Sequence, residues 1–348
     1  MREELARLLG QLEGDTARVR GRFTFDPVVG LRRLAQDRFR QPESYLLALV
    51  QAAVAAGARR FELERHPLYA CACWDGDSSR LEPLATCLRS LTAEHLLFWP
   101  MVGAAASGAS RVLLQTRAQS QALLIEPGRL EMVELPSRRP ELGWSHRLLL
   151  SFAAGRGFRK VPTELSVLRE RCLFAPLRLS CNGSPLEPEV GKPGRSWPWK
   201  ARPGVLLEWV YPGWGLYLPA VKGQLRELRP EGPGSARVAL PPQGTRSYGA
   251  WLALESDLSP GLECRVVHQG VVVARTLLAA RLGGLAVCSS EGMELEASGL
   301  RLVDQRWPAT VTVFETELER LIERARGLGD SLPLSPAGRR RLQAEAGQ

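Results

Sequence analysis

Residues 43–57, ESYLLALVQAAVAAG, are apolar at almost every position, and an alternating apolar and polar run follows at residues 59–64. Ala48, Ala52 and Ala55 recur at spacings of four and three, which places them along one side of a helix. A helix that is apolar nearly all round is ordinarily buried on both sides. The pattern therefore predicts a buried helix that leads directly into a β-strand.

The rest of the chain is dominated by strand-like segments. In the first half they occupy residues 111–116, 121–126, 129–134 and 147–152, with turn-sized gaps that fit an antiparallel sheet under helices. In the second half they occupy residues 205–210, 215–218, 236–240, 250–254, 264–268 and 271–275. Asn182 and Gly183 follow an apolar strand and are a strong hairpin signal. Together these patterns predict an α+β protein.

Two helical patterns frame the second half. Residues 161–171 predict a connecting helix, and residues 311–328 predict a longer helix with Val313, Leu318 and Leu321 on one face. That face either packs on its own domain or forms a contact between two copies of the chain. For residues 330–348 we expect a mobile tail.

The first part of the chain resembles a known family. A strand at residues 22–25, a helix at residues 27–39, the helix (Y/F)LxxLVQxAVxAGA and two strands follow in the order found at the start of the GHKL ATPase superfamily. This superfamily includes the ninety-kilodalton heat-shock chaperones, gyrase B, MutL and the histidine kinases. The resemblance implies a two-layer α/β sandwich, with helices over an antiparallel-rich sheet, followed by a β-rich transducer domain of the ribosomal-protein-like type.

The same resemblance implies a division of the chain. The ATPase-like domain would occupy residues 1–160, the transducer-like domain residues 161–308, and a C-terminal helix with its tail residues 309–348.

The nucleotide helix of the family reads E-x-x-x-N-x-x-D-A, and its three polar positions fall on Ala48, Ala52 and Ala55. In the family, the glutamate acts as the general base for the attacking water, which requires a titratable oxygen. The asparagine oxygen holds Mg²⁺, a cation that prefers oxygen ligands. Alanine supplies neither oxygen. The resemblance thus implies a pseudo-ATPase with no catalytic residue, no metal and no required cofactor, while binding of ATP without Mg-dependent hydrolysis stays open.

Other family positions are kept in part. Asp75 and Gly76 stand where the family has D-x-G-x-G, whose aspartate accepts the adenine amino group. Gly103 and Gly108 belong to residues 101–109, at the position of the glycine-rich lid, although this segment reads better as a short helix than as a phosphate loop. The resemblance implies that these four residues outline a vestigial nucleotide pocket.

Two further family features are altered. The threonine at the start of the last strand falls on Ser145 or His146, and the sequence does not decide between them. The transducer loop that approaches the ATP corresponds to residues 291–302 and normally carries a lysine for the γ-phosphate. No lysine follows Lys222, which leaves an arginine such as Arg301 as a substitute.

Composition and charge limit where the protein is expected to act and which partners it is expected to bind. The chain has 348 residues and is 45% hydrophobic, which is ordinary for a globular protein. Its net charge of +9 is a basic excess. Without a run of eighteen apolar residues or a cleavable apolar leader, we expect a cytoplasmic protein with no membrane segment. Basic clusters at residues 156–160 and 339–341 keep DNA open as a partner, but a solvated basic face is favoured.

The seven cysteines are odd in number and lie mainly in apolar runs, which favours buried free thiols. Cys71 and Cys73 point to the same side of a predicted strand. No second C-x-C sequence and no nearby histidine complete a metal site with them.

Three functional hypotheses follow. The favoured one is a catalytically degenerate GHKL protein that acts as a protein-binding or assembly module, with an unidentified protein partner and a homodimer through residues 311–328 as one arrangement. The second is a chaperone-like switch that binds ATP without hydrolysing it. The third is a MutL-like factor associated with DNA. No phosphate loop of the G-x-x-x-x-G-K type and no G-x-S-x-G elbow support another enzyme class.

Overall fold

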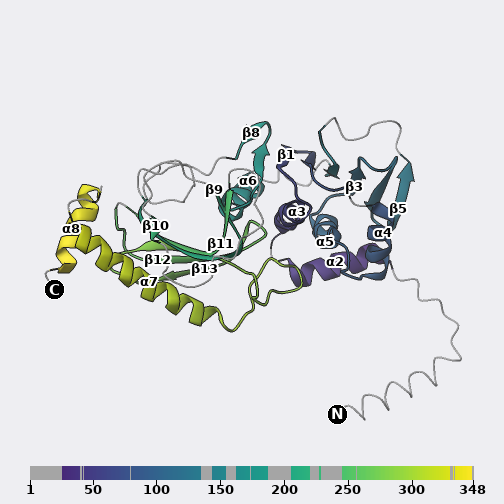
Figure 1. Cartoon of the computed structure of the whole chain (residues 1–348). Helices are drawn as coiled ribbons and strands as arrows, with labels where there is room; N and C mark the ends of the chain where they lie inside the picture. Colours follow the sequence, from purple (N-terminus) through teal and green to yellow (C-terminus); the bar gives the residue numbers. More distant parts are fainter. Residues whose placement is uncertain are drawn as a thin grey trace, which may run out of the picture.

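The structure is a computed structural model that describes residues 26–39, 41, 43–78, 80–134, 143–153, 162–172, 174–186, 205–219, 227–228, 245–255, 257–329, 332 and 334–346. Within these residues the protein has an eight-stranded and a six-stranded sheet together with helices. Figure 1 shows the two sheets in different halves of an elongated molecule. The predicted α+β class is confirmed.

The first half contains most of the helices and the larger sheet. Its helices are α2 (Pro27–Arg38), α3 (Ser44–Ala55), α4 (Leu81–Ser90) and α5 (Phe98–Ala106). Its strands are β1 (Arg60–His66), β2 (Tyr69–Trp74), β3 (Arg111–Thr116), β4 (Gln121–Glu126), β5 (Arg129–Glu134) and β6 (His146–Ser151). The predictions of a buried helix, of the strands and of a helix at the lid position are confirmed.

The larger sheet has the strand order β5-β4-β3-β6-β2-β1-β7-β8, and every pair from β5 to β1 is antiparallel. Strand β6 shows how the alternation of side chains builds two layers. Leu148 and Leu150 are fully buried in the core under the helices, whereas Leu149 packs with Leu113 and Leu124 on the opposite face. The helices therefore cover one face of this sheet.

The predicted hairpin forms between β7 (Arg178–Cys181) and β8 (Ser184–Pro185). Asn182 has φ +49° and Gly183 has φ +73°, as a two-residue turn between twisted strands requires. The hairpin extends the larger sheet, because β7 pairs in parallel with β1, although its residues fall in the range expected for the transducer-like domain. Helix α6 (Pro162–Arg171) precedes it and supplies the crossover that a parallel pair needs.

The second half is built on the smaller sheet, whose strand order is β10-β9-β11-β14-β12-β13. The strands are β9 (Val205–Pro219), β10 (Glu227–Leu228), β11 (Thr245–Glu255), β12 (Leu262–His268), β13 (Val271–Leu278) and β14 (Gly284–Ser289). The two segments predicted between residues 205 and 218 are one continuous strand, β9. The segment predicted at residues 236–240 lies outside the described residues.

Helix α7 (Trp307–Leu328) packs along one face of the smaller sheet. Phe314, Leu318 and Leu321 are buried there, so the apolar face of this helix is covered by its own chain. Val313 was expected on the same face but is 51% exposed, because it lies one position before Phe314 and so turns away from the sheet.

The segment for which we expected a tail contains helix α8 (Pro336–Ala346). Leu332 and Leu342 are buried in the same core as α7, and this burial holds the segment against the second half. In Figure 1 this helix lies at the end of the molecule away from the larger sheet.

Among the described residues, no helix is both long enough and apolar enough to cross a bilayer. The strand expected at residues 22–25, the basic cluster at residues 156–160 and the predicted domain boundary at residue 160 lie outside the described residues.

Candidate functional site

Helix α3 is the part of the molecule that resembles a nucleotide helix, and every residue from Ser44 to Ala53 is buried. Ala48 and Ala52 are each 3% exposed, while Ala55 in the last turn is exposed. The side chain at each of the three positions is a single methyl group. None of them can activate water or bind Mg²⁺.

Asp75 lies just after β2 and its carboxylate organises the start of β1. Its Oδ1 accepts hydrogen bonds from the backbone N–H groups of Arg59 and Arg60, both at 2.7 Å, and its Oδ2 is 3.5 Å from the Arg60 side-chain Nε. The next residue, Gly76, has φ +115°, and a Cβ atom there would lie 2.8 Å from the carbonyl oxygen of Ala56. Asp75 thus has structural contacts at the start of β1, and Gly76 lies against the C-terminal end of α3.

Gly103 and Gly108 also have structural roles. A Cβ atom on Gly103 would lie 2.9 Å from the Cβ atom of Tyr45, so this glycine lets α5 approach the first turn of α3. Gly108 follows α5 with φ +86°, a conformation that glycine adopts without strain. Tyr45 and Ala56 are eleven residues apart, about 16 Å along a helix. Gly103 and Gly76 therefore contact opposite ends of α3.

Ser145 and His146, the two candidates for the family threonine, differ in their surroundings. The Ser145 N–H donates to the carbonyl oxygen of Trp74 at 3.0 Å. The His146 ring is 1% exposed and stacks on the Trp74 ring, with centroids 4.8 Å apart. Burial, helped by the charge of His95, lowers the pKa of His146 to about 4, so the ring is neutral near pH 7.

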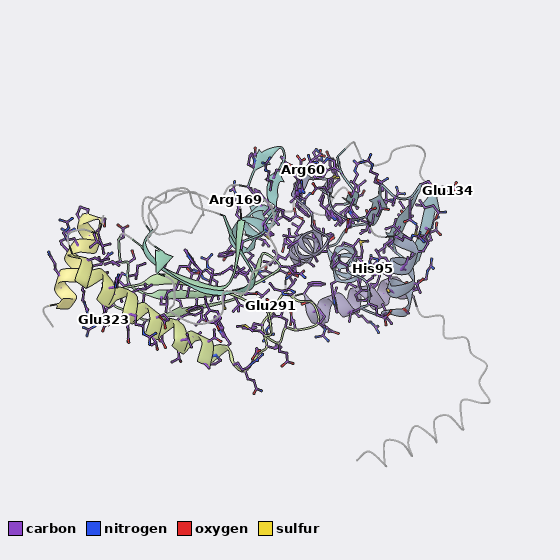
Figure 2. All side chains as sticks on the ribbon, viewed as in Figure 1. Arg60, His95, Glu134, Arg169, Glu291 and Glu323 are labelled. Carbon is purple, nitrogen blue, oxygen red and sulfur yellow. The ribbon has the colours of Figure 1, made fainter. Side chains whose placement is uncertain are left out.

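A contact between the two halves lies on α3 itself. The Gln51 side-chain Nε2 donates to the carbonyl oxygens of Gly299, at 2.9 Å, and of His268, at 3.4 Å. Gly299 belongs to the loop at residues 291–302, and Figure 2 shows Glu291, at the start of that loop, between the two halves. Sequence reasoning missed Gln51, although a single amide in an otherwise apolar helix was a usable signal. Arg301, the expected substitute for the lysine, is exposed.

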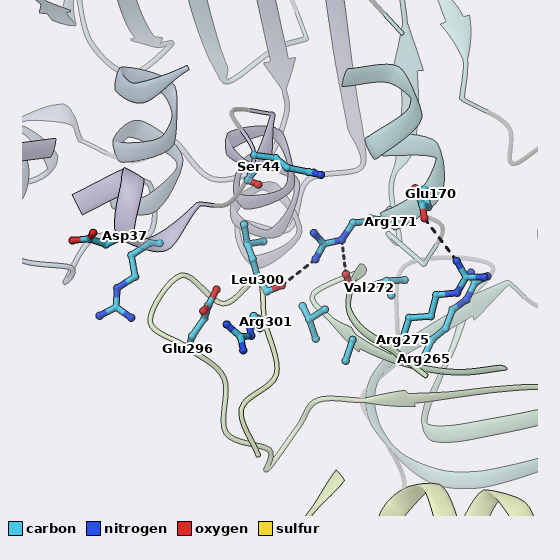
Figure 3. A pocket seen from close by; sticks show the side chains of 14 residues that line it. Asp37, Ser44, Glu170, Arg171, Arg265, Val272, Arg275, Glu296, Leu300 and Arg301 are labelled. Carbon is cyan, nitrogen blue, oxygen red and sulfur yellow. Dashed lines mark hydrogen bonds and ion pairs between the residues drawn. The ribbon is translucent and has the colours of Figure 1, made fainter. Parts of the chain in front are cut away.

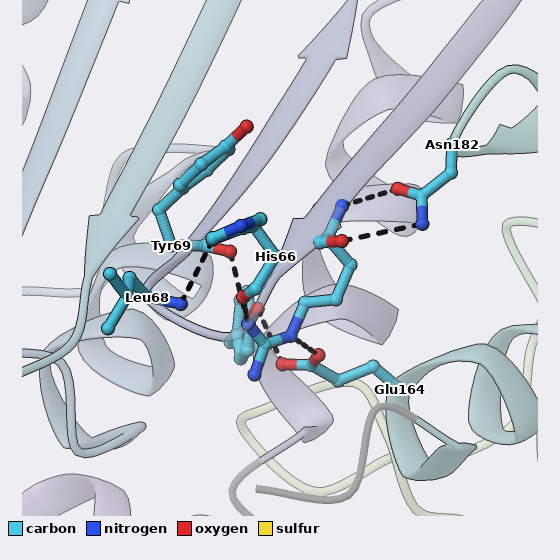
Figure 4. A network of polar contacts seen from close by, with 7 residues as sticks. His66, Leu68, Tyr69, Glu164 and Asn182 are labelled. Carbon is cyan, nitrogen blue, oxygen red and sulfur yellow. Dashed lines mark hydrogen bonds and ion pairs between the residues drawn. The ribbon is translucent and has the colours of Figure 1, made fainter. Parts of the chain in front are cut away.

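A buried charge network joins α3, β1, α6 and the hairpin turn (Figure 4). The Arg65 side-chain Nε donates to Glu164, and both side chains are at most 3% exposed. The Tyr45 hydroxyl donates to the other Glu164 oxygen at 3.2 Å. Asn182 accepts from the Arg65 backbone N–H at 2.6 Å and donates back to the Arg65 carbonyl at 3.4 Å. The hairpin turn is thereby fixed to β1.

The face of the larger sheet opposite the helices carries a pair of thiols beside a cavity of about 560 Å³. The Cys71 and Cys73 sulfur atoms are 3.8 Å apart, which confirms that both side chains point to one side of the strand. The hydrogen bond from Cys73, with a further contribution from the Arg147 guanidinium at 3.3 Å, lowers the pKa of Cys71 to about 7. The same pairing raises the pKa of Cys73. Cys71 is therefore the more acidic thiol of the pair.

All seven cysteines are free thiols and five are buried, as the sequence predicted. Within the part of the chain that the structure describes, no group of three or more histidine, cysteine, aspartate or glutamate side chains is arranged to hold a metal ion.

Compared with models of known protein families and with curated protein sequences, the chain matches none. The assignment of a function therefore depends on the geometry of the chain itself.

Proposed function

We propose that this protein is a catalytically degenerate GHKL-like protein that acts as a protein-binding or assembly scaffold and does not hydrolyse ATP. The layout of helices over one face of an antiparallel-rich sheet supports the likeness. The methyl groups of Ala48, Ala52 and Ala55 support the loss of hydrolysis. Neither Ala48, Ala52 nor Asp75 lines the cavity beside the thiol pair.

The contact of Gln51 carries the proposal. In the family, the transducer loop approaches the ATP, so that nucleotide joins the two domains. Here the Gln51 amide, one residue before the position of the metal-binding asparagine, hydrogen-bonds the corresponding loop directly. Protein groups thus make the connection that nucleotide makes in an ATPase, which favours a scaffold closed without ATP.

The same contacts give less support to an ATP-binding switch and to a homodimer through residues 311–328. An ATP-binding switch needs Asp75 to accept a hydrogen bond from adenine, but its Oδ1 already accepts two backbone hydrogen bonds. A homodimer through residues 311–328 would have to use the outer side of α7, because its apolar face packs on its own sheet.

Phosphate release and scattering experiments test the proposal. With Mg-ATP we expect no turnover above that of buffer, and we expect the same radius of gyration by small-angle X-ray scattering with and without Mg-ATP, because the halves are already joined. Calorimetry with ATP and a DNA-retention assay at low salt examine the switch and the DNA-associated factor.

Turnover that disappears in a folded Asp75→Asn variant and persists in Arg320→Gln would overturn the proposal. Arg320 is a suitable control because its side chain is 67% exposed on α7. A compaction on adding Mg-ATP would overturn it as well.

A further inference from the structure

A second cavity, of about 430 Å³, lies between the two halves of the molecule (Figure 3). It is bounded by the end of α2, the start of α3, the end of α6, strands β12 and β13, and the loop before α7. Its lining contains three carboxylates and the five arginines Arg38, Arg171, Arg265, Arg275 and Arg301. The lining therefore has an excess of two positive charges.

Arg265 is the most informative of these arginines. It is 6% exposed, and its Nε donates to the Glu263 carboxylate at 2.7 Å. Its terminal NH1 group is buried and, within the described part of the chain, has no hydrogen-bond partner. A buried charged donor without an acceptor is costly, so an acceptor from outside the chain would relieve it.

The neighbouring charges do not neutralise Arg265 fully. Arg275 lies directly opposite it on β13, and its Nε contacts the same Glu263 oxygen at 2.5 Å, so one carboxylate serves two guanidinium groups. Glu170 is a more distant partner of Arg275, at 3.9 Å. With Glu263 counted, the cavity still has more positive than negative groups around it.

Arg171 adds a third guanidinium to the same cavity. Its Nε donates to the Val272 carbonyl at 2.8 Å and its NH2 group donates to the Leu300 carbonyl at 3.0 Å, as Figure 3 shows. Neutral carbonyl oxygens fix the position of this group without cancelling its charge. Planar guanidinium groups held in this way match the geometry of phosphate oxygens.

We propose that this cavity binds the phosphate group of a small phosphorylated ligand, with the free NH1 group of Arg265 as the buried anchor and Arg275 and Arg171 as additional donors. The site uses residues of β12, β13 and α6, and none of the residues at positions 48, 52 and 75. Phosphate binding here would draw the two halves together, because α6 and β12–β13 both contribute. The inference is independent of whether ATP is hydrolysed.

Inorganic phosphate is the first probe, with melting temperature and calorimetry as readouts and sodium chloride at equal ionic strength as the reference. We expect saturable stabilisation of the wild-type protein. Arg265→Met should weaken phosphate binding about 10- to 100-fold, because charge-assisted hydrogen bonds to a buried group are lost. Arg320→Gln removes the same charge from an exposed position and should bind phosphate as the wild type does.

ADP in place of phosphate tests whether the phosphate group belongs to a nucleotide. If it does, ADP binding is lost in Arg265→Met and retained in Asp75→Asn. If Arg265→Met does not fold, Arg275→Gln, whose side chain is 55% exposed in the wild type, serves instead and should bind several-fold more weakly. The absence of saturable stabilisation of the wild type by phosphate, or equal affinities in Arg265→Met and Arg320→Gln, would overturn the proposal.

Discussion

Helix α3 is held at two places by different chemistry. At the inner joint, which consists of Tyr45, Arg65 and Glu164, a buried ion pair and a hydroxyl group tie the helix to α6 and β1. At the outer joint, which consists of Gln51, His268 and Gly299, a neutral amide donates to two carbonyl oxygens of the second half. One joint is charged and lies within the first half. The other is neutral and connects the halves.

The difference bears on which part of the molecule can open. Separating a buried ion pair costs several kcal/mol of free energy, about 3–5 kcal/mol, because each charge left without its partner is poorly solvated. A neutral hydrogen bond exchanged for one to water changes the free energy by only about 0.5–1.5 kcal/mol. We therefore expect α3 to stay with the first half whenever the two halves separate.

The largest effect is expected from breaking the inner joint. Glu164→Gln keeps the shape of the side chain but leaves the Arg65 charge unbalanced, and it should lower the free energy of unfolding by about 3–5 kcal/mol. Urea denaturation measures this loss. The pair Arg320 and Glu317 on α7 provides the control, because the Arg320 side chain is 67% exposed and stays solvated without its partner, so Glu317→Gln should cost no more than about 1 kcal/mol.

A double variant separates charge from packing at the inner joint. Arg65→Met combined with Glu164→Met removes both charges together and should recover much of the loss. Equal costs for Glu164→Gln and Glu317→Gln would show that the inner joint is not the rigid one.

Acid should weaken the first half by a mechanism separate from either joint. Because burial lowers the pKa of His146 from 6.5 to about 4, the unfolded chain binds more protons than the folded chain between these values. The stability that neutral His146 provides is complete above pH 6.5 and is lost as the pH falls toward 4, by about 3 kcal/mol. Denaturation across this pH range measures the slope.

His146→Gln should flatten that slope, because the ring that gains a proton on unfolding in acid is removed. Burial also lowers the pKa of His268 at the outer joint, so part of the acid sensitivity should persist in His146→Gln. An unaltered slope in His146→Gln would contradict the assignment.

Local patterns were sufficient for much of the fold. Apolar runs and turn signals predicted α3, α5 and strands β3 to β6, because the buried face of each of these elements is marked by apolar residues within its own segment. The placement of the β7–β8 hairpin was not predictable in this way, since its pairing with β1 depends on Asn182 bonding to a strand more than a hundred residues away. Val313 was misplaced because the apolar face of α7 is set by the sheet beneath it.

The candidate site was predicted less well than the fold. The alanines at positions 48, 52 and 55 can be read from a single segment of sequence. Arg265 and its cavity are not, because the donors come from α6, β12 and β13, and the missing partner of one nitrogen atom is a property of the folded structure alone.

The smallest effect is expected at the outer joint, and it concerns opening more than stability. Gln51→Ala removes two neutral hydrogen bonds and should cost about 1–2 kcal/mol. Because those bonds connect the halves, amide hydrogen exchange should accelerate in the loop that contains Gly299 while the core of α3 stays protected. Gln119→Ala is the matched control, since Gln119 accepts from the Leu81 N–H at 2.8 Å and donates to Glu82 within the first half. Equal exchange in the loop of both variants would mean that Gln51 does not hold the halves together, and the distinction between the two joints would fail with it.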